Sequence, residues 1–340
     1  MFVAVNQYIE LVGDSEPYTK TLGVIDVCRR DASGRPLCFV GNNSVIFKIR
    51  HEGRTRMLKC YTVPKRNLRR IYGERCLHDE LFVPCGGSGE YVDVVLADWV
   101  EGRTLKRAIR EAAGDSEAMG GLAREFDRFA LELLDAEWAH GDLKPENIIV
   151  DDEGRMHAID FDAVYRPDLA DLRSEEVGTA AFQHPQRGSW MYDKAMDDYP
   201  IALISSALHA LAADESLWES VETDAFLVFD PHDMVKGKCR LLASILKMFA
   251  GRCMGAEYQI AKLLASPSPY LPRLRNLLRW KTARLSEERN GTPVLEVDNG
   301  LWGYKSGGRF VVAPLFDCGW EYRNGRALVE LGGFRHQIQI

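Results

Sequence analysis

The sequence predicts an α+β fold with a small antiparallel β lobe, a helical lobe and a C-terminal β appendage. Short strand patterns dominate residues 37–100, helical spacing of apolar residues dominates residues 101–288, and residues 291–340 return to strand patterns rich in Gly, Val and aromatic side chains. Segregated strands and helices are typical of this architecture, and 340 residues exceed what one core usually supports. Residues 1–36 are expected to be an N-terminal extension.

The β lobe is expected to begin with a hairpin. Residues 37–40 and 44–49 are apolar, strand-like runs, and Gly41 with two asparagines separates them. A third strand is expected at residues 57–61 and a later one at residues 90–97.

A helix is expected between the third strand and the strand at residues 90–97. Pro64 can occupy a first helical turn, and Leu68, Ile71 and Leu77 form an imperfect apolar stripe after it.

The helical lobe is predicted from three strongly patterned segments. Residues 122–138 carry apolar side chains at helical spacing, including Phe126 and Phe129. Residues 201–212 and 240–250 are apolar enough to be buried helices.

Composition excludes several classes of protein. A net charge of −7 argues against nucleic acid as a partner, and no run approaches the ~20 apolar residues that span a bilayer, so no membrane partner is expected. The eight cysteines occur singly, without a Cys-x-x-Cys pair, which favours reduced thiols over a zinc site. The N-terminus lacks a basic leader. Together these features predict a cytoplasmic protein.

Four polar residues form a constellation suited to phosphoryl transfer. Asp142, Lys144 and Asn147 lie within six residues, directly after the 122–138 segment, and Asp160 follows on the next hairpin. Phosphoryl transfer needs a carboxylate to orient the attacking hydroxyl, oxygen ligands for Mg²⁺ and a cation against the developing charge. These residues supply all three.

With His140-Gly141-Asp142 and Ile159-Asp160-Phe161, this constellation resembles the eukaryotic-like protein kinase superfamily over roughly residues 37–285. The resemblance implies that Asp142 is the catalytic base and that Lys144 supports the transferring phosphate. It also implies that Asn147 and Asp160 bind Mg²⁺ and that ATP is the phosphate donor.

The same resemblance implies roles for residues around the loop. Lys59, on the third expected strand, matches the lysine that holds the α- and β-phosphates, and Glu74 is its expected ion-pair partner, with Glu80 the alternative. Thr179, in the segment from Gly178 to Arg187, matches the threonine that bridges the catalytic Asp and Lys.

Two more positions in that part of the sequence have expected roles. Gln186 stands where the family has a glutamate, which weakens the usual anchor of the segment. Asp197 matches the aspartate that braces the loop backbone.

The expected nucleotide site is degenerate at its glycine loop. Phe39, Gly41 and Ser44 stand at the three glycine positions of the family, and Ile46 stands at its valine. Backbone amides near Gly41 and Ser44 can still approach phosphates.

The segment at residues 96–102 resembles the linker that binds adenine through its backbone. Ala97 falls at the gatekeeper position, and Asp98 and Val100 belong to the linker.

The tail resembles a WG repeat. Residues 299–305, with Trp302-Gly303-Tyr304, and residues 310–317 match its turn and apolar strand. Because one β unit cannot bury both faces, we expect it to pack on the lobes or on a docking partner, with Trp302 and Trp320 in the core.

Three functional hypotheses remain open. The first is a Ser/Thr-type protein kinase with protein substrates. The second is a small-molecule or sugar kinase, because the His140-Gly141-Asp142 loop resembles theirs. The third is a nucleotide-binding pseudokinase scaffold, suggested by the glycine loop and Gln186. None of the catalytic groups is missing, which favours an enzyme.

Overall fold

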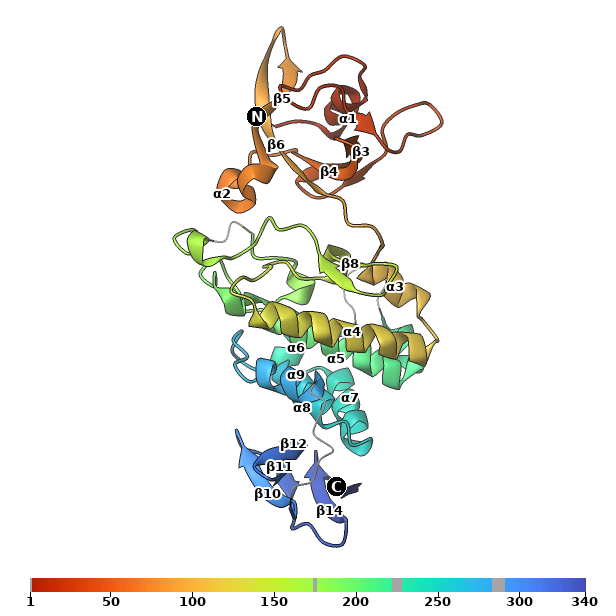
Figure 1. The fold of residues 1–340 in the computed structure, drawn as a ribbon, viewed down its shortest axis with the longest axis vertical. Coiled ribbons are helices and arrows are strands. Elements are labelled where there is room, and N and C mark those ends of the chain that lie inside the picture. The colour runs from red at the N-terminus through yellow and green to blue at the C-terminus, as the bar shows by residue number, and fades with distance from the viewer. Residues whose placement is uncertain (1, 174–175, 222–227, 283–290) are drawn as a thin grey trace. The chain divides into compact units, whose positions relative to one another are not determined.

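The computed structural model describes residues 2–173, 176–221, 228–282 and 291–340. The chain is mixed α+β and divides into two compact units, Met1–Glu101 and Gly102–Ile340 (Figure 1).

The first unit is built on an antiparallel sheet. Its strands lie in the order β1-β3-β4-β6-β5, and β2 pairs with β3 beside β1. The elements of the unit are α1 (Val5–Gly13), β1 (Asp26–Val27), β2 (Cys38–Val40), β3 (Ser44–His51), β4 (Arg54–Tyr61), α2 (Leu68–Tyr72), the 3₁₀ turn η1 (Gly73–Arg75), β5 (Cys76–Cys85) and β6 (Ser88–Asp98).

The expected hairpin and third strand are confirmed. Strands β2 and β3 pair antiparallel, and the amide of Gly41 donates to the carbonyl of Ser44 at 2.8 Å, which closes a tight turn. Strand β4 pairs with β3 and β6, with Lys59 opposite Ile46 and Val95. Lys59 therefore lies on a central strand.

Residues 1–36 contribute to the core of this unit. Tyr8 and Val12 of α1 are fully buried among side chains of β3 to β6, and Val27 of β1 joins the same cluster. The hydroxyl of Tyr8 donates to the carbonyl of Tyr61 at 2.6 Å. The segment is thus part of the folded unit.

The helix expected after Pro64 is much shorter than its apolar stripe suggested. Helix α2 has five residues and ends at Tyr72. The next residue, Gly73, has a φ of +58°, a conformation that stops an α-helix. Leu77 lies in β5 instead. The expectation of one helix from Pro64 to Leu77 was wrong.

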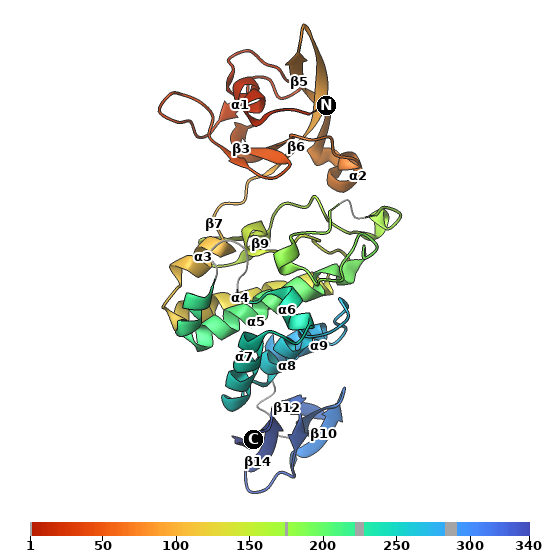
Figure 2. The same cartoon turned by 180° about the vertical axis from the view of Figure 1, so that it is seen from behind.

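Helices of the second unit surround one apolar core. Helix α4 lies alongside α5, the most buried helix, in both views (Figures 1 and 2). The α-helices are α3 (Leu105–Glu111), α4 (Ser116–Asp135), α5 (Asp198–Ala213), α6 (Pro231–Val235), α7 (Arg240–Gly251), α8 (Gly255–Leu263) and α9 (Leu274–Thr282). Within the described ranges, no helix has both the length and the apolar character needed to cross a membrane.

Short elements connect these helices. The strands are β7 (Arg103–Thr104), β8 (Ile148–Val150) and β9 (Met156–Ala158), which form one sheet. The 3₁₀ turns are η2 (Pro145–Asn147), η3 (Pro167–Leu169), η4 (Ala180–Phe182), η5 (Lys194–Asp197) and η6 (Glu215–Ser220).

A buried charge network joins four helices of this core. Asp127 of α4 accepts hydrogen bonds from Ser205 at 2.6 Å and His209 at 2.8 Å, both on α5. The ammonium of Lys281, on α9, forms an ion pair with Asp127 at 2.8 Å and with Glu257 of α8 at 3.5 Å. Burial alone raises the pKa of Asp127, but the charge of Lys281 and the hydrogen bond from His209 outweigh it and lower the pKa to about 2.

The tail forms two three-stranded antiparallel sheets that pack on α7 and α8. The strands are β10 (Val294–Asp298), β11 (Leu301–Ser306), β12 (Arg309–Phe316), β13 (Cys318–Gly319), β14 (Arg326–Leu331) and β15 (Phe334–Gln339). Tyr304 is fully buried in a cluster that includes Ala250 and Tyr258. Trp302 is half-buried against this cluster, but Trp320 is 36% exposed, so its expected core position was wrong.

Candidate functional site

The site of the second unit lies on a loop between α4 and β8, residues 140–147, hereafter the 140–147 loop. It ends in η2, and the β8–β9 hairpin follows it directly. The carbonyl of Asn147 accepts from the amide of Ile159 at 2.9 Å. This bond places Asp160 next to the end of the loop.

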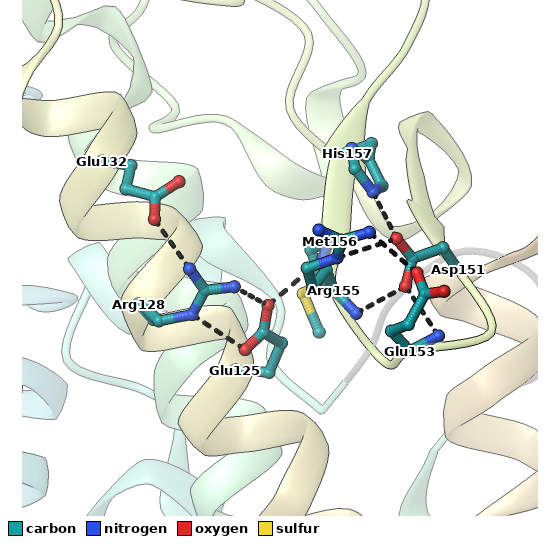
Figure 3. A network of polar contacts seen from close by, with 8 residues as sticks. All are labelled: Glu125, Arg128, Glu132, Asp151, Glu153, Arg155, Met156 and His157. Carbon is teal, nitrogen blue, oxygen red and sulfur yellow. Dashed lines mark hydrogen bonds and ion pairs between the residues drawn. The ribbon is translucent and has the colours of Figure 1, made fainter.

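A polar network fixes the β8–β9 hairpin (Figure 3). Asp151 accepts from the amide of Arg155 at 2.8 Å and pairs with His157 at 2.7 Å; this hydrogen bond lowers the pKa of Asp151 to about 2. Glu125 of α4, itself paired with Arg128, accepts from the amide of Met156 at 3.3 Å. The hairpin that carries Asp160 is thus anchored on α4.

The carboxylate of Asp142 is the centre of the loop's contacts. Its Oδ2 accepts from Nζ of Lys144 at 2.9 Å and from Nδ2 of Asn147 at 3.2 Å. Its Oδ1 accepts from the amide of Thr179 at 2.6 Å, and Lys144 also donates to the hydroxyl of Thr179 at 2.8 Å. Four predicted residues are therefore brought together, and Thr179 bridges Asp142 and Lys144 as expected.

Two side chains brace the backbone of the loop. Asp197 is 2% exposed and accepts from the amides of His140 and Gly141, the latter at 2.9 Å, which confirms the predicted bracing role. Nδ1 of His140 accepts from the amide of Asp142 at 3.3 Å, so Nε2 carries the proton and donates to the carbonyl of Ile159 at 2.7 Å. The His140 ring thereby ties Asp142 to the hairpin.

The oxygen groups at the end of the loop fit a hard divalent cation. The amide nitrogen of Asn147 is committed to the Asp142 carbonyl at 2.9 Å and to its carboxylate, which leaves Oδ1 of Asn147 as its acceptor for a metal. The carboxylate of Asp160 is the second candidate ligand. The backbone φ of Asp160 is +66°, a conformation that Asp tolerates better than most residues. Carboxylate and amide oxygens are the ligands that Mg²⁺ prefers.

Two glycines are required by close approach of backbone and side chains. A methyl group built on Gly141, whose φ is +85°, would lie 2.2 Å from the carbonyl oxygen of Ala163. One built on Gly178 would lie 2.8 Å from the carbonyl oxygen of Gly141 and 3.1 Å from Oδ1 of Asp142. Position 141 therefore has no room for a side chain.

The predicted phosphate-binding residues of the first unit lie on its sheet. Lys59 is 1% exposed, Ser44 is buried, Ile46 is half-buried and Gly41 is exposed at the turn. A methyl group built on Gly41 would lie no closer than 3.4 Å to its neighbours, which is ordinary contact. The structure therefore gives Gly41 no steric reason to be glycine.

The predicted linker continues from β6. Ala97 is half-buried near the end of the strand, Asp98 is exposed and pairs with Arg56, and Val100 is half-buried beyond the strand. The ring of Trp99 packs against the ring of Phe39 in β2, with 5.7 Å between the ring centroids.

Neither candidate partner of Lys59 is supported by a contact. Glu74 is exposed in η1, since the helix that was expected to carry it already ends at Tyr72. Glu80 is buried, but its carboxylate accepts from the amides of Thr21 and Leu22 at 2.7 and 2.9 Å. The pairing of Lys59 with Glu74 therefore stays a prediction.

In the segment around Gln186, the shielded polar groups belong to neighbouring residues and not to Gln186 itself. Gln186 is exposed, whereas Gln183 and His184 are buried and Arg187 is half-buried, with its Nε and Nη2 shielded from solvent. Neither Gln183 nor Arg187 was predicted from the sequence. The clue in the sequence is an arginine in a segment between the apolar residues Phe182 and Met191.

A scan against protein-family models found no match to this chain, and a search of curated proteins found no match either.

Proposed function

We propose that the chain is an ATP-dependent phosphotransferase of the protein-kinase type that phosphorylates Ser or Thr hydroxyls of proteins and uses Mg²⁺. The observation that carries the proposal is the set of contacts on the Asp142 carboxylate, made by Lys144, Asn147 and Thr179. An antiparallel sheet with Lys59 on a central strand, in a separate unit, supports the bilobal kinase-like arrangement implied by the sequence.

Asp142 would orient the attacking hydroxyl and accept its proton. An ionised carboxylate offers about four acceptor positions. Lys144, Asn147 and Thr179 occupy three of them. The remaining position is available to a substrate hydroxyl, and the three contacts fix the direction in which it points.

Lys144 would offset the charge of the transferring phosphoryl group. Its ammonium is held between Asp142 and the hydroxyl of Thr179, so one of its three N–H groups is left for a phosphate oxygen. Mg²⁺ bound by Asn147 and Asp160 would neutralise charge on the phosphates of ATP.

Transfer of label from γ-labelled ATP with Mg²⁺ tests the proposal, with the chain itself and generic proteins as acceptors. Asp142→Asn keeps the shape but removes the base, and we expect a loss of about 10²- to 10⁴-fold. Asp152→Asn, an exposed carboxylate in the β8–β9 turn, is the matched control and should retain activity. No transfer by the wild type, despite MgATP binding seen by thermal shift, would overturn the proposal.

A small-molecule kinase is the second candidate. The observation that favours it is the steric requirement for glycine at position 141, which makes the loop a His-Gly-Asp loop in structure as well as in sequence. The same assay with sugars and aminoglycosides as acceptors separates the two functions. Label found in a small molecule, absent from proteins and lost in Asp142→Asn, would establish the second.

A further inference from the structure

The guanidinium of Arg187 is largely shielded from solvent beside Gln183 and is not part of the mechanism above. Nη1 of Arg187 donates to Oε1 of Gln183. Its Nε and Nη2 are shielded from solvent and have no hydrogen-bond partner among the described residues. Burying a charge without hydrogen-bond partners costs folding free energy unless opposite charges lie nearby.

The compensating charges belong to the site. Burial lowers the pKa of Arg187, while the carboxylates of Asp197, Asp142 and Asp193 raise it. Asp197 is itself 2% exposed, and its two oxygens are committed to the amides of the 140–147 loop. A buried carboxylate in that role needs a cation, and a guanidinium stays charged at every physiological pH.

Gln183 links Arg187 to Gly178, the residue before Thr179. Its side chain is 4% exposed and lies against Gly178, where a built methyl group would be 2.7 Å from Nε2 of Gln183. The same methyl position is 3.1 Å from Oδ1 of Asp142. Gln183 therefore packs where the residues before Thr179 meet the 140–147 loop.

We infer that Arg187 is a positioning residue: its fixed charge holds the Gly178–Thr179 backbone against the 140–147 loop and thereby keeps Asp142 in its contacts. Within the loop, Lys144 supplies a positive charge to Asp142, and Arg187 adds a second positive charge from outside the loop. The effect of Arg187 on catalysis rests on the proposed function, but its effect on the backbone contacts does not.

Hydrogen exchange in the full chain tests the positional role without any activity. The amides to follow are those of Thr179, His140 and Gly141, which donate to Asp142 and Asp197. We expect Arg187→Met, which keeps the length but removes the charge, to speed their exchange on the order of ten- to a hundredfold, while α5 stays protected.

Two further variants sharpen the test. Arg187→Lys keeps the charge and should restore most of the protection, and Arg309→Met, at an exposed arginine, should change nothing. If Arg187→Met does not fold, Gln183→Leu is measured instead and should affect the amide of Thr179 most. Unchanged exchange at the three amides, or an equal rise in α5, would overturn the inference.

Kinetics then separate the inference from the proposed function. If the wild type transfers phosphate, Arg187→Met should lower kcat at least about tenfold, with KM for ATP unchanged, and Arg187→Lys should recover it. A fall in both variants alike would contradict a role of the charge. If the wild type transfers no phosphate but Arg187→Met still loses protection locally, the proposed function is overturned and the positional role is supported.

Discussion

Gly141→Ala is expected to destabilise the protein far more than alanine at a positive-φ glycine with open surroundings. The left-handed conformation costs a non-glycine residue about 1–2 kcal/mol. The new methyl group would also lie 2.2 Å from the carbonyl oxygen of Ala163 and 2.7 Å from Cε of Met196. Overpacking of this kind costs a further ~1–3 kcal/mol, so the total is about 2–5 kcal/mol.

The matched control is Gly154→Ala. Gly154 has a φ of +80°, and a methyl group built there meets no described atom within 4 Å, so this variant pays only the conformational cost of about 1–2 kcal/mol. Equilibrium urea unfolding, followed by tryptophan fluorescence, gives both costs as shifts of the midpoint. Equal shifts for the two variants would refute the reasoning, since the contacts with Ala163 and Met196 are what distinguishes them.

Three further substitutions test charges and contacts in the second unit. Lys281→Met leaves Asp127 without its buried cation and should cost about 3–5 kcal/mol in urea unfolding, whereas a cost below 1 kcal/mol would contradict the network. Because the folded pKa of Asp127 is about 2, below its usual 3.8, the wild type should also lose stability as the pH falls from about 4 to 2. Burial, with Asp197 nearby, raises the pKa of Asp198 to about 7, so the folded chain holds a proton there and its stability falls as the pH rises from about 4 to 7. Asp198→Asn should therefore raise the free energy of unfolding at pH 8 by at most about 4 kcal/mol, seen as a higher Tm, and leave Tm unchanged near pH 4. Equal changes in Tm at both pH values would rule out this role for the Asp198 proton. Asp317→Ala removes the acceptor of Gln259 and of the amide of Gly332, so limited proteolysis should release the tail faster than in wild type, and an unchanged rate would argue that apolar packing alone holds it.

Local patterns predicted the elements that depend on neighbouring residues. The hairpin around Gly41 was expected from two apolar runs and helix α4 from helical spacing; the hairpin formed close to its expected bounds, whereas α4 begins six residues earlier than expected and ends three residues earlier. The short range of these signals is also why α2 was misjudged. The stripe from Leu68 to Leu77 continues in sequence across Gly73, but the backbone conformation there ends the helix.

The composition of the site followed from the sequence, since a loop of eight residues carries Asp142, Lys144 and Asn147 at fixed spacing. Its bracing by Asp197, 57 residues from His140, was anticipated through the family resemblance and then found as hydrogen bonds.

Only the tertiary structure decided the rest. The burial of Tyr8, Val12 and Val27, the buried network of Asp127 and Lys281, and the shielded guanidinium of Arg187 all depend on segments that are distant in sequence. Propensity and periodicity report on a few residues at a time, whereas the cost of burying a charge depends on which partners the fold brings beside it. The sequence by itself determined which groups the site contains, and the packing of distant segments decided how they are held.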